Sequence, residues 1–476
     1  MVRAMAHRPE GGLHVRCLFL AGVAFVLALP GQATAAEPAR PNVLLITIDT
    51  LRADHLSSYG YHLLTTPRLD RLAAEGVRFE RAYTAIPLTG PSHISLLTGR
   101  YPQEHGGKVN GQPLAEDPRL VTLAQILQSN NYRTAAYVSA WPLKERLTRL
   151  DRGFEVYDQE FNRQYQLFNS YRSAEDVTPL AIRWMQERAK DSPREPFFLW
   201  AHYFDPHKPY HLREEFSHLK PNPGGTYQPA PLNKKMADRI RRYDTEIAYT
   251  DHHIGKLLDE LETLGLREST LIIVVADHGE SLGERGYVGH GRQLYDNIVR
   301  VPLILSYPAT IPSGRVVHQH VSLLDVMPTV LDLLGIDFPL SLQGKTLKPF
   351  FEDPSRQRAG ATYFVTFAGK NWEAPRWLSW MWYVDSRDRL PLKMGWVLDE
   401  QKIIWTPRSN KVEVFDVAKD QREIEPVFLG RTKDRYQRQV NQLLAWFKAT
   451  AIYRDEPSPL KKKDIEILKS LGYVGD

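Results

Sequence analysis

The sequence predicts an α/β protein: an α/β/α sandwich around a large, mostly parallel mixed sheet, with a smaller C-terminal antiparallel-sheet subdomain. Apolar segments of strand length alternate along the chain with amphipathic helical segments, which is typical of a sheet covered by helices on both faces. Three of the strand segments end in polar, ionisable residues. From about residue 350 the sequence becomes aromatic, alternating and rich in turn residues, which favours a separate antiparallel sheet.

The first part of the chain contains four strand segments and the helices between them. The strand segments are 41–50, the end of 122–139, 195–205 and 269–280. Helical periodicity covers the start of 122–139, then 177–190 and 241–265. The stretch 205–235, rich in Pro, His and Lys, is predicted to be a long loop over the site.

The alternating segment 377–417 predicts the small antiparallel sheet, and a helix near 433–450 and a Lys-rich tail follow it. We therefore expect a main domain over residues 40–350 and a C-terminal subdomain over 351–476, with the small sheet and terminal helices.

The N-terminus has the order of a secretory signal peptide. Three arginines precede the apolar run from Cys17 to Leu29, and the small residues Ala33-Thr34-Ala35 follow it. The alternative is a single membrane anchor, but the run is shorter than the roughly 20 residues that cross a bilayer comfortably. We expect residues 1–35 to be a signal peptide cleaved near Ala35 or Ala36, a periplasmic or secreted mature chain, and no stable membrane span after cleavage.

Composition excludes several classes of protein and site. With 42% apolar and 25% charged residues, the chain is neither disordered nor embedded in a membrane. A net charge of +5 on 476 residues is weak, so it gives no reason to expect nucleic acid, although it favours anionic substrates. The single cysteine, Cys17, lies in the leader, which excludes disulfides, thiolate metal sites and a cysteine nucleophile in the mature chain.

Asp49, Asp205, Asp277 and His278 stand at or just after strand ends. A lone aspartate at a strand end is usually a helix cap or turn residue. The adjacent pair Asp277-His278, followed by a glycine, is harder to explain as capping alone, because a carboxylate and an imidazole leaving one buried strand suit a divalent metal ion. This mixed oxygen and nitrogen set favours Mn, Mg, Ca or Zn.

The stretch "IPLTGPSHISLLTGRYP" (86–102) predicts a helix that starts at Thr89-Gly90-Pro91 and stops at Gly99. A hydroxyl at that start faces unpaired backbone N–H groups, which favour an anion and a developing alkoxide. A metal ion held by Asp49, Asp277 and His278 could bind the Thr89 oxygen and lower its pKa. The alternative is that Thr89 only caps the helix.

From about residue 40 to 476 the chain resembles the type I sulfatase-like family of the alkaline phosphatase superfamily. The family signature places the nucleophile before x-Pro-Ser-Arg, three residues, and Leu-Thr-Gly-Arg; here it reads Thr89-Gly-Pro-Ser-His93, then Ile-Ser-Leu, then Leu-Thr-Gly-Arg100. Further segments in family order are "IDTLRADHLSSYGY", "FDPHKPY", "ADHGESLGERGYVGHG", "RVPLIL", "LLDVMPTVLDLLG", "VEVFDVAKDQRE" and "LKSLGYVGD".

The resemblance implies roles for individual residues. Asp49, Asp277 and His278 match metal ligands, and Thr89 matches the nucleophile, which also binds the metal. His207 in "DPHKPY" and His290 in "GHG" match substrate-contacting positions, the latter usually a lysine, and we expect one of them to protonate the leaving alcohol. His93, Arg100 and Asp205 are expected to bind substrate; alternatively, Asp205, His207 and His290 form a second metal site.

Four departures from the family pattern bear on the chemistry. Threonine is not expected to mature to formylglycine as Cys or Ser does. His93 replaces the usual arginine, Thr50 stands where a second metal-binding aspartate is common, and 137–145 lacks a Gly-Lys-x-His run. All four resemble the threonine-nucleophile relatives: phosphodiesterases, phosphonate esterases, and phosphoglycerol or phosphoethanolamine transferases.

We therefore expect an exported, metal-dependent hydrolase of ester bonds that cleaves phosphate, phosphonate or, less readily, sulfate esters of small molecules, glycans or lipids through Thr89, without formylglycine. One divalent ion, or two, would be bound. The alternatives are transfer of the group to a sugar or lipid hydroxyl, and an inactive binding protein that keeps the fold.

The leader generates the first testable prediction. N-terminal sequencing of exported protein should give a mature chain that begins near residue 36, because cleavage follows the Ala-x-Ala pattern. An exported chain that still begins at Met1 would refute the assignment.

Overall fold

A computed structural model of the chain describes residues 40–165, 168–192, 194–337, 342–367, 390–432, 435–451, 461, 463–464 and 466–467. The predicted signal peptide, residues 377–389 of the aromatic segment and most of the Lys-rich tail lie outside these residues, whereas the helix predicted near 433–450 is found at Gln437–Thr450. Arg40–Asp476 belong to one compact unit, and the division near residue 350 stays a prediction.

Three parallel strands form the centre of the main sheet. β1 (Asn42–Ile48) lies between β7 (Phe197–Tyr203) and β8 (Thr270–Ala276). All their residues are buried, which explains why their sequences are almost continuously apolar: helices cover both faces. The strands confirm the segments predicted at 41–50, 195–205 and 269–280.

The complete sheet has eight strands in the order β12-β2-β11-β8-β1-β7-β3-β4. Within it, only β11 runs antiparallel to its neighbours, so the predicted mostly parallel mixed sheet is confirmed. The outer strands are β2 (Val77–Tyr83), β3 (Arg133–Tyr137), β4 (Val156–Asp158), β11 (Arg300–Ser306) and β12 (Arg315–Ser322).

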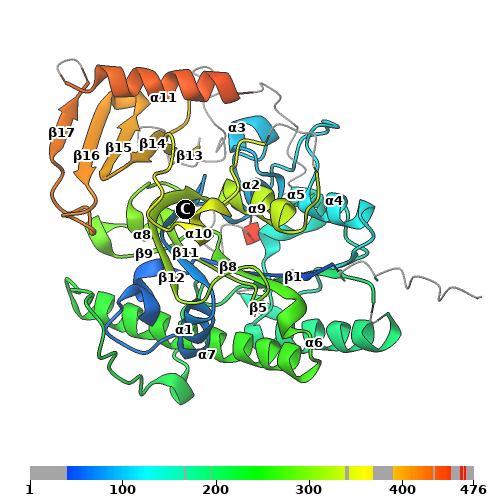
Figure 1. Cartoon of the computed structure of the whole chain (residues 1–476). Helices are drawn as coiled ribbons and strands as arrows, with labels where there is room; N and C mark the ends of the chain where they lie inside the picture. The colour runs from blue at the N-terminus through cyan, green and yellow to red at the C-terminus, as the bar shows by residue number, and fades with distance from the viewer. Residues whose placement is uncertain are drawn as a thin grey trace, which may run out of the picture. The chain divides into compact units, whose positions relative to one another are not determined.

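Helices form a layer on each side of this sheet (Figure 1). One layer contains α1 (Pro67–Ala74), α6 (Ala174–Asp191) and α7 (Lys234–Thr263). The other contains α2 (Thr89–Thr98), α4 (Leu123–Ser129), α9 (Val326–Leu333) and the short helices α3 (Pro102–His105), α5 (Glu145–Thr148) and α10 (Pro349–Glu352).

Helix α7 begins earlier than predicted. The apolar periodicity predicts the helix from residue 241, whereas α7 begins at Lys234. The side chain of Asn233 accepts a hydrogen bond from the N–H of Met236 and caps a polar first turn. That turn carries little apolar pattern, so sequence periodicity alone misses it. Among the described residues, no helix is both long and apolar enough to pass through a lipid bilayer.

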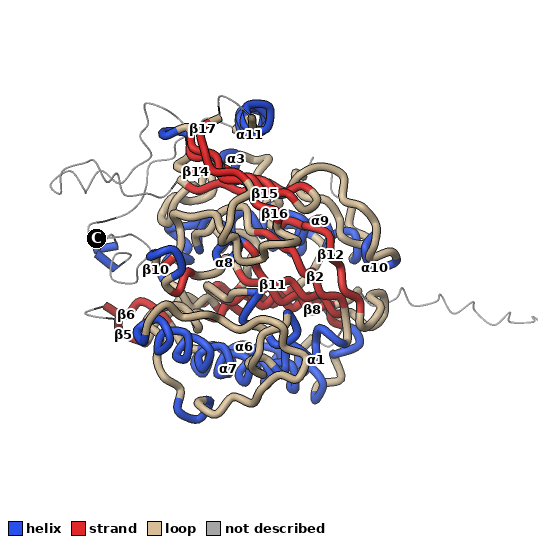
Figure 2. The backbone as a smooth tube through the Cα atoms, turned by 90° about the vertical axis from the view of Figure 1, so that its left-hand side faces the viewer, coloured by secondary structure: helices blue, strands red, loops and turns tan. Residues whose placement is uncertain are grey.

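The second sheet is antiparallel, as predicted, and α11 (Gln437–Thr450) lies beside it (Figure 2). The buried side chains of Val440, Leu443 and Phe447 pack that helix against the sheet. Its strand order is β13-β14-β15-β16-β17. The strands are β13 (Thr362–Thr366), β14 (Lys393–Leu398), β15 (Gln401–Thr406), β16 (Lys411–Asp416) and β17 (Phe428–Arg431).

A buried cation joins the second sheet to the rest of the molecule. Lys402 of β15 is fully buried and pairs with Asp296 (2.5 Å) and Glu423 (2.7 Å). Burial raises the pKa of Glu423 to about 7. Asp296 begins α8 (Asp296–Val299), which follows the hairpin of β9 (Ser281–Leu282) and β10 (Val288–Gly289). A second short pair, β5 (Arg163–Tyr165) and β6 (Phe168–Tyr171), lies before α6.

Candidate active site

The ends of β1 and β8 bring Asp49 and Asp277 together. Ile48 and Ala276 are partners in the parallel register, so the next residue of each strand leaves the sheet at the same edge. Asp49, Asp277 and His278 are fully buried, and one ligand atom from each lies within 4.8 Å of the others. In the described part of the chain this is the single such group of three or more His, Cys, Asp or Glu residues.

Hydrogen bonds turn the donor atoms of this group toward one another. Asp277 Oδ1 accepts the N–H groups of Thr50 (3.2 Å) and His278 (2.8 Å), whereas Oδ2 accepts none from the described residues. His278 Nδ1 donates to the carbonyl of Gly279 (2.9 Å), so its Nε2 lone pair faces Asp277 Oδ2 (3.5 Å) and Asp49 Oδ1 (3.9 Å).

This donor set fits a divalent metal ion. Burial lowers the pKa of His278 well below its ordinary value, so the ring is neutral and does not balance the two carboxylates. Burial also raises the pKa of Asp277. The group therefore combines Asp277 Oδ2, which accepts no hydrogen bond from the described residues, with the carboxylate of Asp49 and the lone pair of His278. This combination is unfavourable in a buried site unless a cation binds between them.

Thr89 is the first residue of α2 and is fully buried. Its Oγ1 lies 3.4 Å from His278 Nε2, which places the hydroxyl at the metal-ligand group. The N-cap position belongs to Leu88, and no side chain caps the helix there, so Thr89 is not simply a cap. The helix ends as predicted at Gly99, whose φ of 63° lies in the left-handed region that favours glycine.

Asn110 holds the backbone next to Thr89. Its Oδ1 accepts the N–H of Gly90 at 2.8 Å. A Cβ added to Gly90 would lie 3.1 Å from the same oxygen, so glycine permits this close approach. Sequence reasoning missed Asn110, because it stands in a turn with no pattern that points to the site.

The two predicted proton donors lie beside His278. The rings of His290 and His278 are 4.3 Å apart, and those of His290 and His207 are 5.3 Å apart. His207 Nδ1 donates to the carbonyl of Lys208 (2.6 Å), and burial lowers the pKa of His207 well below its ordinary value. His290 Nδ1 lies 3.4 Å from Oε1 of the buried Glu280. Glu280 was not among the predicted site residues, although it stands only two positions after His278.

His93 was predicted to bind substrate, but the structure turns both of its ring nitrogens toward protein atoms. It is fully buried beneath Thr89, where Nδ1 contacts the Thr89 carbonyl (2.8 Å) and Nε2 contacts Thr47 Oγ1 (3.0 Å). Since both ring nitrogens are used inside the protein, His93 has no atom to offer to a ligand.

Arg100, also predicted to bind substrate, is not brought to the group. It follows the opposite end of α2 and pairs with Glu104 at 2.8 Å. At about 1.5 Å of rise per residue, that end of the helix is roughly 15 Å from Thr89.

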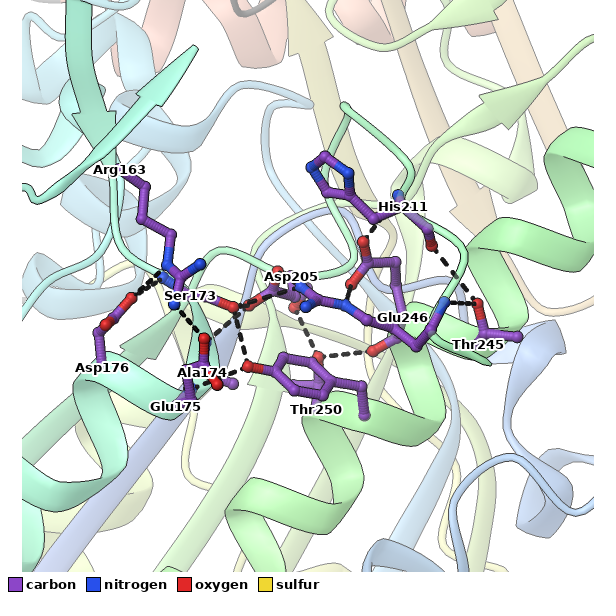
Figure 3. A network of polar contacts seen from close by, with 12 residues as sticks. Arg163, Ser173, Ala174, Glu175, Asp176, Asp205, His211, Thr245, Glu246 and Thr250 are labelled. Carbon is purple, nitrogen blue, oxygen red and sulfur yellow. Dashed lines mark hydrogen bonds and ion pairs between the residues drawn. The ribbon is translucent and has the colours of Figure 1, made fainter. Parts of the chain in front are cut away.

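The carboxylate of Asp205, the third predicted substrate-binding group, belongs to a buried polar network (Figure 3). Asp205 Oδ2 accepts from Ala174 N (2.7 Å) and Ser173 Oγ (3.1 Å) at the start of α6, and Oδ1 accepts from Arg213 (3.2 Å). Arg213 also donates to Glu246 (2.8 Å). Asp205 therefore anchors the loop that carries His207, and its oxygens are turned to these partners instead of to a second metal site.

Known protein families match most of this chain. Residues 41–336 match the family model described as Sulfatase, and residues 283–449 match that described as N-sulphoglucosamine sulphohydrolase, C-terminal. The N-acetylglucosamine-6-O-sulfatase of Bacteroides thetaiotaomicron is 25% identical over 517 residues, which cover 90% of this chain and 89% of the relative.

Solved structures confirm the predicted fold. A protein solved with its substrate D-glucosamine-2-N,6-O-disulfate has a TM-score of 0.67 and 22% identity, covering 86% of this chain and 97% of that one. The phosphonate monoester hydrolase of Agrobacterium radiobacter has a TM-score of 0.66 and 22% identity, covering 87% of this chain and 96% of that one.

The ligand group generates a prediction about metal content. Asp277→Asn should lower the amount of divalent metal in dialysed protein, measured by mass spectrometry, because an amide cannot supply the negative oxygen. Asp238→Asn, a change at an exposed carboxylate of α7, is the control and should leave the metal content unchanged. Equal metal content in wild type and Asp277→Asn would contradict the ligand assignment.

The Asp205 network generates a prediction about pH. Burial, and then the neighbouring carboxylate of Asp205, raise the pKa of Glu246 to about 8, although Arg213 and the N–H of His211 act in the opposite direction. A carboxyl whose pKa is raised on folding contributes stability below its unfolded pKa and loses it as pH rises through the folded pKa. The free energy of unfolding should therefore fall between about pH 5 and 8, by about 1–3 kcal/mol more in wild type than in Glu246→Gln.

Denaturant unfolding at several pH values measures this difference. Glu262→Gln, on the exposed side of the same helix, should keep the wild-type pH dependence because a surface ion pair contributes little. Parallel pH curves for wild type and Glu246→Gln would show that Glu246 is ionised at neutral pH.

Proposed function

This chain belongs to the sulfatase family, whose matched relatives are ester hydrolases, and on that premise we propose that it hydrolyses phosphodiesters or phosphonate monoesters through Thr89. One observation carries the proposal. The hydroxyl of Thr89, at the nucleophile position of the family signature, lies 3.4 Å from His278 Nε2 within a buried Asp–Asp–His group.

The side chain of Thr89 favours phosphorus over sulfur. A threonine hydroxyl cannot supply the geminal diol of formylglycine, which releases sulfate by C–O elimination. A sulfate ester on Thr89 would have to be hydrolysed at sulfur, whereas a phosphate ester is cleaved by water through the same kind of step that formed it. The chain's one cysteine, Cys17, is far from this position in the sequence.

In the proposed reaction, Thr89 Oγ1 releases its proton to water and forms a bond to phosphorus as the bond from phosphorus to the leaving alcohol oxygen breaks. A histidine of the His207–His290 pair gives a proton to that oxygen and takes one back from solvent. A water molecule then attacks phosphorus, the bond to Thr89 Oγ1 breaks, and Thr89 takes a proton from that water. The net reaction consumes one water and yields an alcohol and a phosphate monoester or a phosphonate.

Asp49, Asp277, His278 and the Thr89 hydroxyl would hold the divalent ion, for which Mn, Mg, Ca and Zn are suitable. When bound, such an ion supplies positive charge that stabilises the anionic oxygens of the reacting group.

We extend the proposal to location and organisation. The leader directs the chain to the periplasm or the exterior. Residues 40–350 form the catalytic domain, and residues 351–476 form the C-terminal subdomain. The expected substrate is a small-molecule, glycan or lipid ester. Two of the matched proteins act on sugar esters, according to their names: the N-acetylglucosamine-6-O-sulfatase and the protein solved with D-glucosamine-2-N,6-O-disulfate.

The test of this function compares esters that differ in their central atom. We expect kcat/KM to be higher on bis(p-nitrophenyl) phosphate or a p-nitrophenyl phosphonate than on p-nitrophenyl sulfate, since only the sulfate needs the missing diol. Thr89→Ala should lower kcat/KM by about 10³-fold or more, as loss of a nucleophile does in other hydrolases.

Thr98→Ala is the matched control for that variant. Thr98 is buried at the other end of α2, and its hydroxyl donates to the Ile94 carbonyl (2.6 Å), so its loss should affect stability alone. A clear preference for the sulfate ester, or full turnover in Thr89→Ala, would overturn the proposed nucleophile.

A further inference from the structure

Three polar side chains form a continuous path beneath the proposed nucleophile. Trp200 of β7, Thr47 of β1 and His93 of α2 are all fully buried. Trp200 Nε1 lies 2.9 Å from Thr47 Oγ1, Thr47 Oγ1 lies 3.0 Å from His93 Nε2, and His93 Nδ1 lies 2.8 Å from the carbonyl oxygen of Thr89.

The chemistry of these groups fixes the direction of the two outer hydrogen bonds. An indole N–H can only donate, so Trp200 donates to the Thr47 oxygen. At the other end a carbonyl oxygen can only accept, so His93 Nδ1 carries the proton that reaches Thr89. In the middle contact, Thr47 either donates its hydroxyl to Nε2 or accepts from an Nε2–H, and in both cases His93 is protonated on Nδ1.

We propose that Trp200, Thr47 and His93 are positioning residues that hold Thr89 so that its hydroxyl stays directed at His278. This inference rests on the proposed function of Thr89. None of the three side chains needs to touch substrate; they act through the backbone of the residue that does.

The geometry connects the nucleophile to a metal ligand through one strand. Thr47 is the last residue but one of β1, and Asp49 directly follows the last residue, Ile48, so one strand carries both. Asp49 belongs to the ligand group, and Thr47 supports His93, so the end of β1 sets the position of both the ligand and the nucleophile.

Packing fixes the ring of His93 as well as its hydrogen bonds. The ring lies 5.4 Å from that of Trp200 and 5.0 Å from that of His202, whose Nδ1 contacts Ser139 Oγ at 2.7 Å. A ring held by two neighbours and two hydrogen bonds can transmit a small displacement of Thr47 to Thr89.

Kinetics of Thr47 variants test the proposal. Thr47→Val keeps the branched shape but removes the hydroxyl, and we expect kcat on bis(p-nitrophenyl) phosphate to fall roughly 10-fold to 100-fold, as misplaced reacting groups do. KM and metal content should change by no more than about twofold, because ligands and substrate contacts remain. Thr47→Ser keeps the hydroxyl and should retain kcat to within about threefold.

NMR of the imidazole nitrogens tests it independently in wild-type protein. Two-bond ¹H–¹⁵N spectra, with His93 identified by the signal missing from His93→Gln, should show a ring protonated on Nδ1. In Thr47→Val the same signal should shift toward a mixture of tautomers. A wild-type ring protonated on Nε2 alone would overturn the proposal even if the valine variant fails to fold.

Thr89→Ala, measured alongside, separates the two ideas. If Thr89→Ala remains active, the proposed function fails. If Thr89→Ala is inactive while folded Thr47→Val keeps wild-type kcat, the function stands and the positioning role of Thr47, His93 and Trp200 is wrong.

Discussion

Two buried carboxylates at the ends of neighbouring parallel strands are the constraint on which the rest of the site depends. The register of β1 and β8 places Asp49 beside Asp277, and neither side chain is exposed to water. Two such charges repel each other and lose their hydration, so the surroundings must compensate them. Backbone N–H groups satisfy one oxygen of Asp277, and the imidazole of His278 is neutral, so the divalent ion that we propose would supply the compensation that remains.

The backbone at Thr50 shows how strictly this arrangement is maintained. Thr50 has a φ of 58°, an uncommon conformation for a β-branched residue. That conformation points its N–H at Asp277 Oδ1, and the hydroxyl of Tyr243 donates to its carbonyl at 2.6 Å. Local strain at a residue beside a ligand is typical of positions where the surrounding contacts determine the geometry.

The sequence predicted the sheet, and the meeting of Asp49, Asp277 and His278 at its edge, for a physical reason. Continuous apolar strands identify a sheet buried on both faces, and polar residues directly after Ile48 and Ala276 must lie at one edge of it. Residues whose roles depend on long-range partners could not be read in this way. Asp205 also follows a strand, but Arg213 and the start of α6 take up its oxygens. His93 and Asn110 act on the backbone of α2, which no spacing reveals.

The buried Lys402 has a consequence for the order in which the molecule is completed during synthesis. Asp296, just beyond the hairpin that leads to His290, has its cationic partner more than a hundred residues later in the chain, and Arg285 of the same hairpin donates to the carbonyl of Arg422 (3.1 Å). A nascent chain that ends before β15 would leave Asp296 buried without Lys402. The ion pair that joins this segment to the second sheet can therefore form only after the ribosome has made β15, later than the residues of the candidate site themselves.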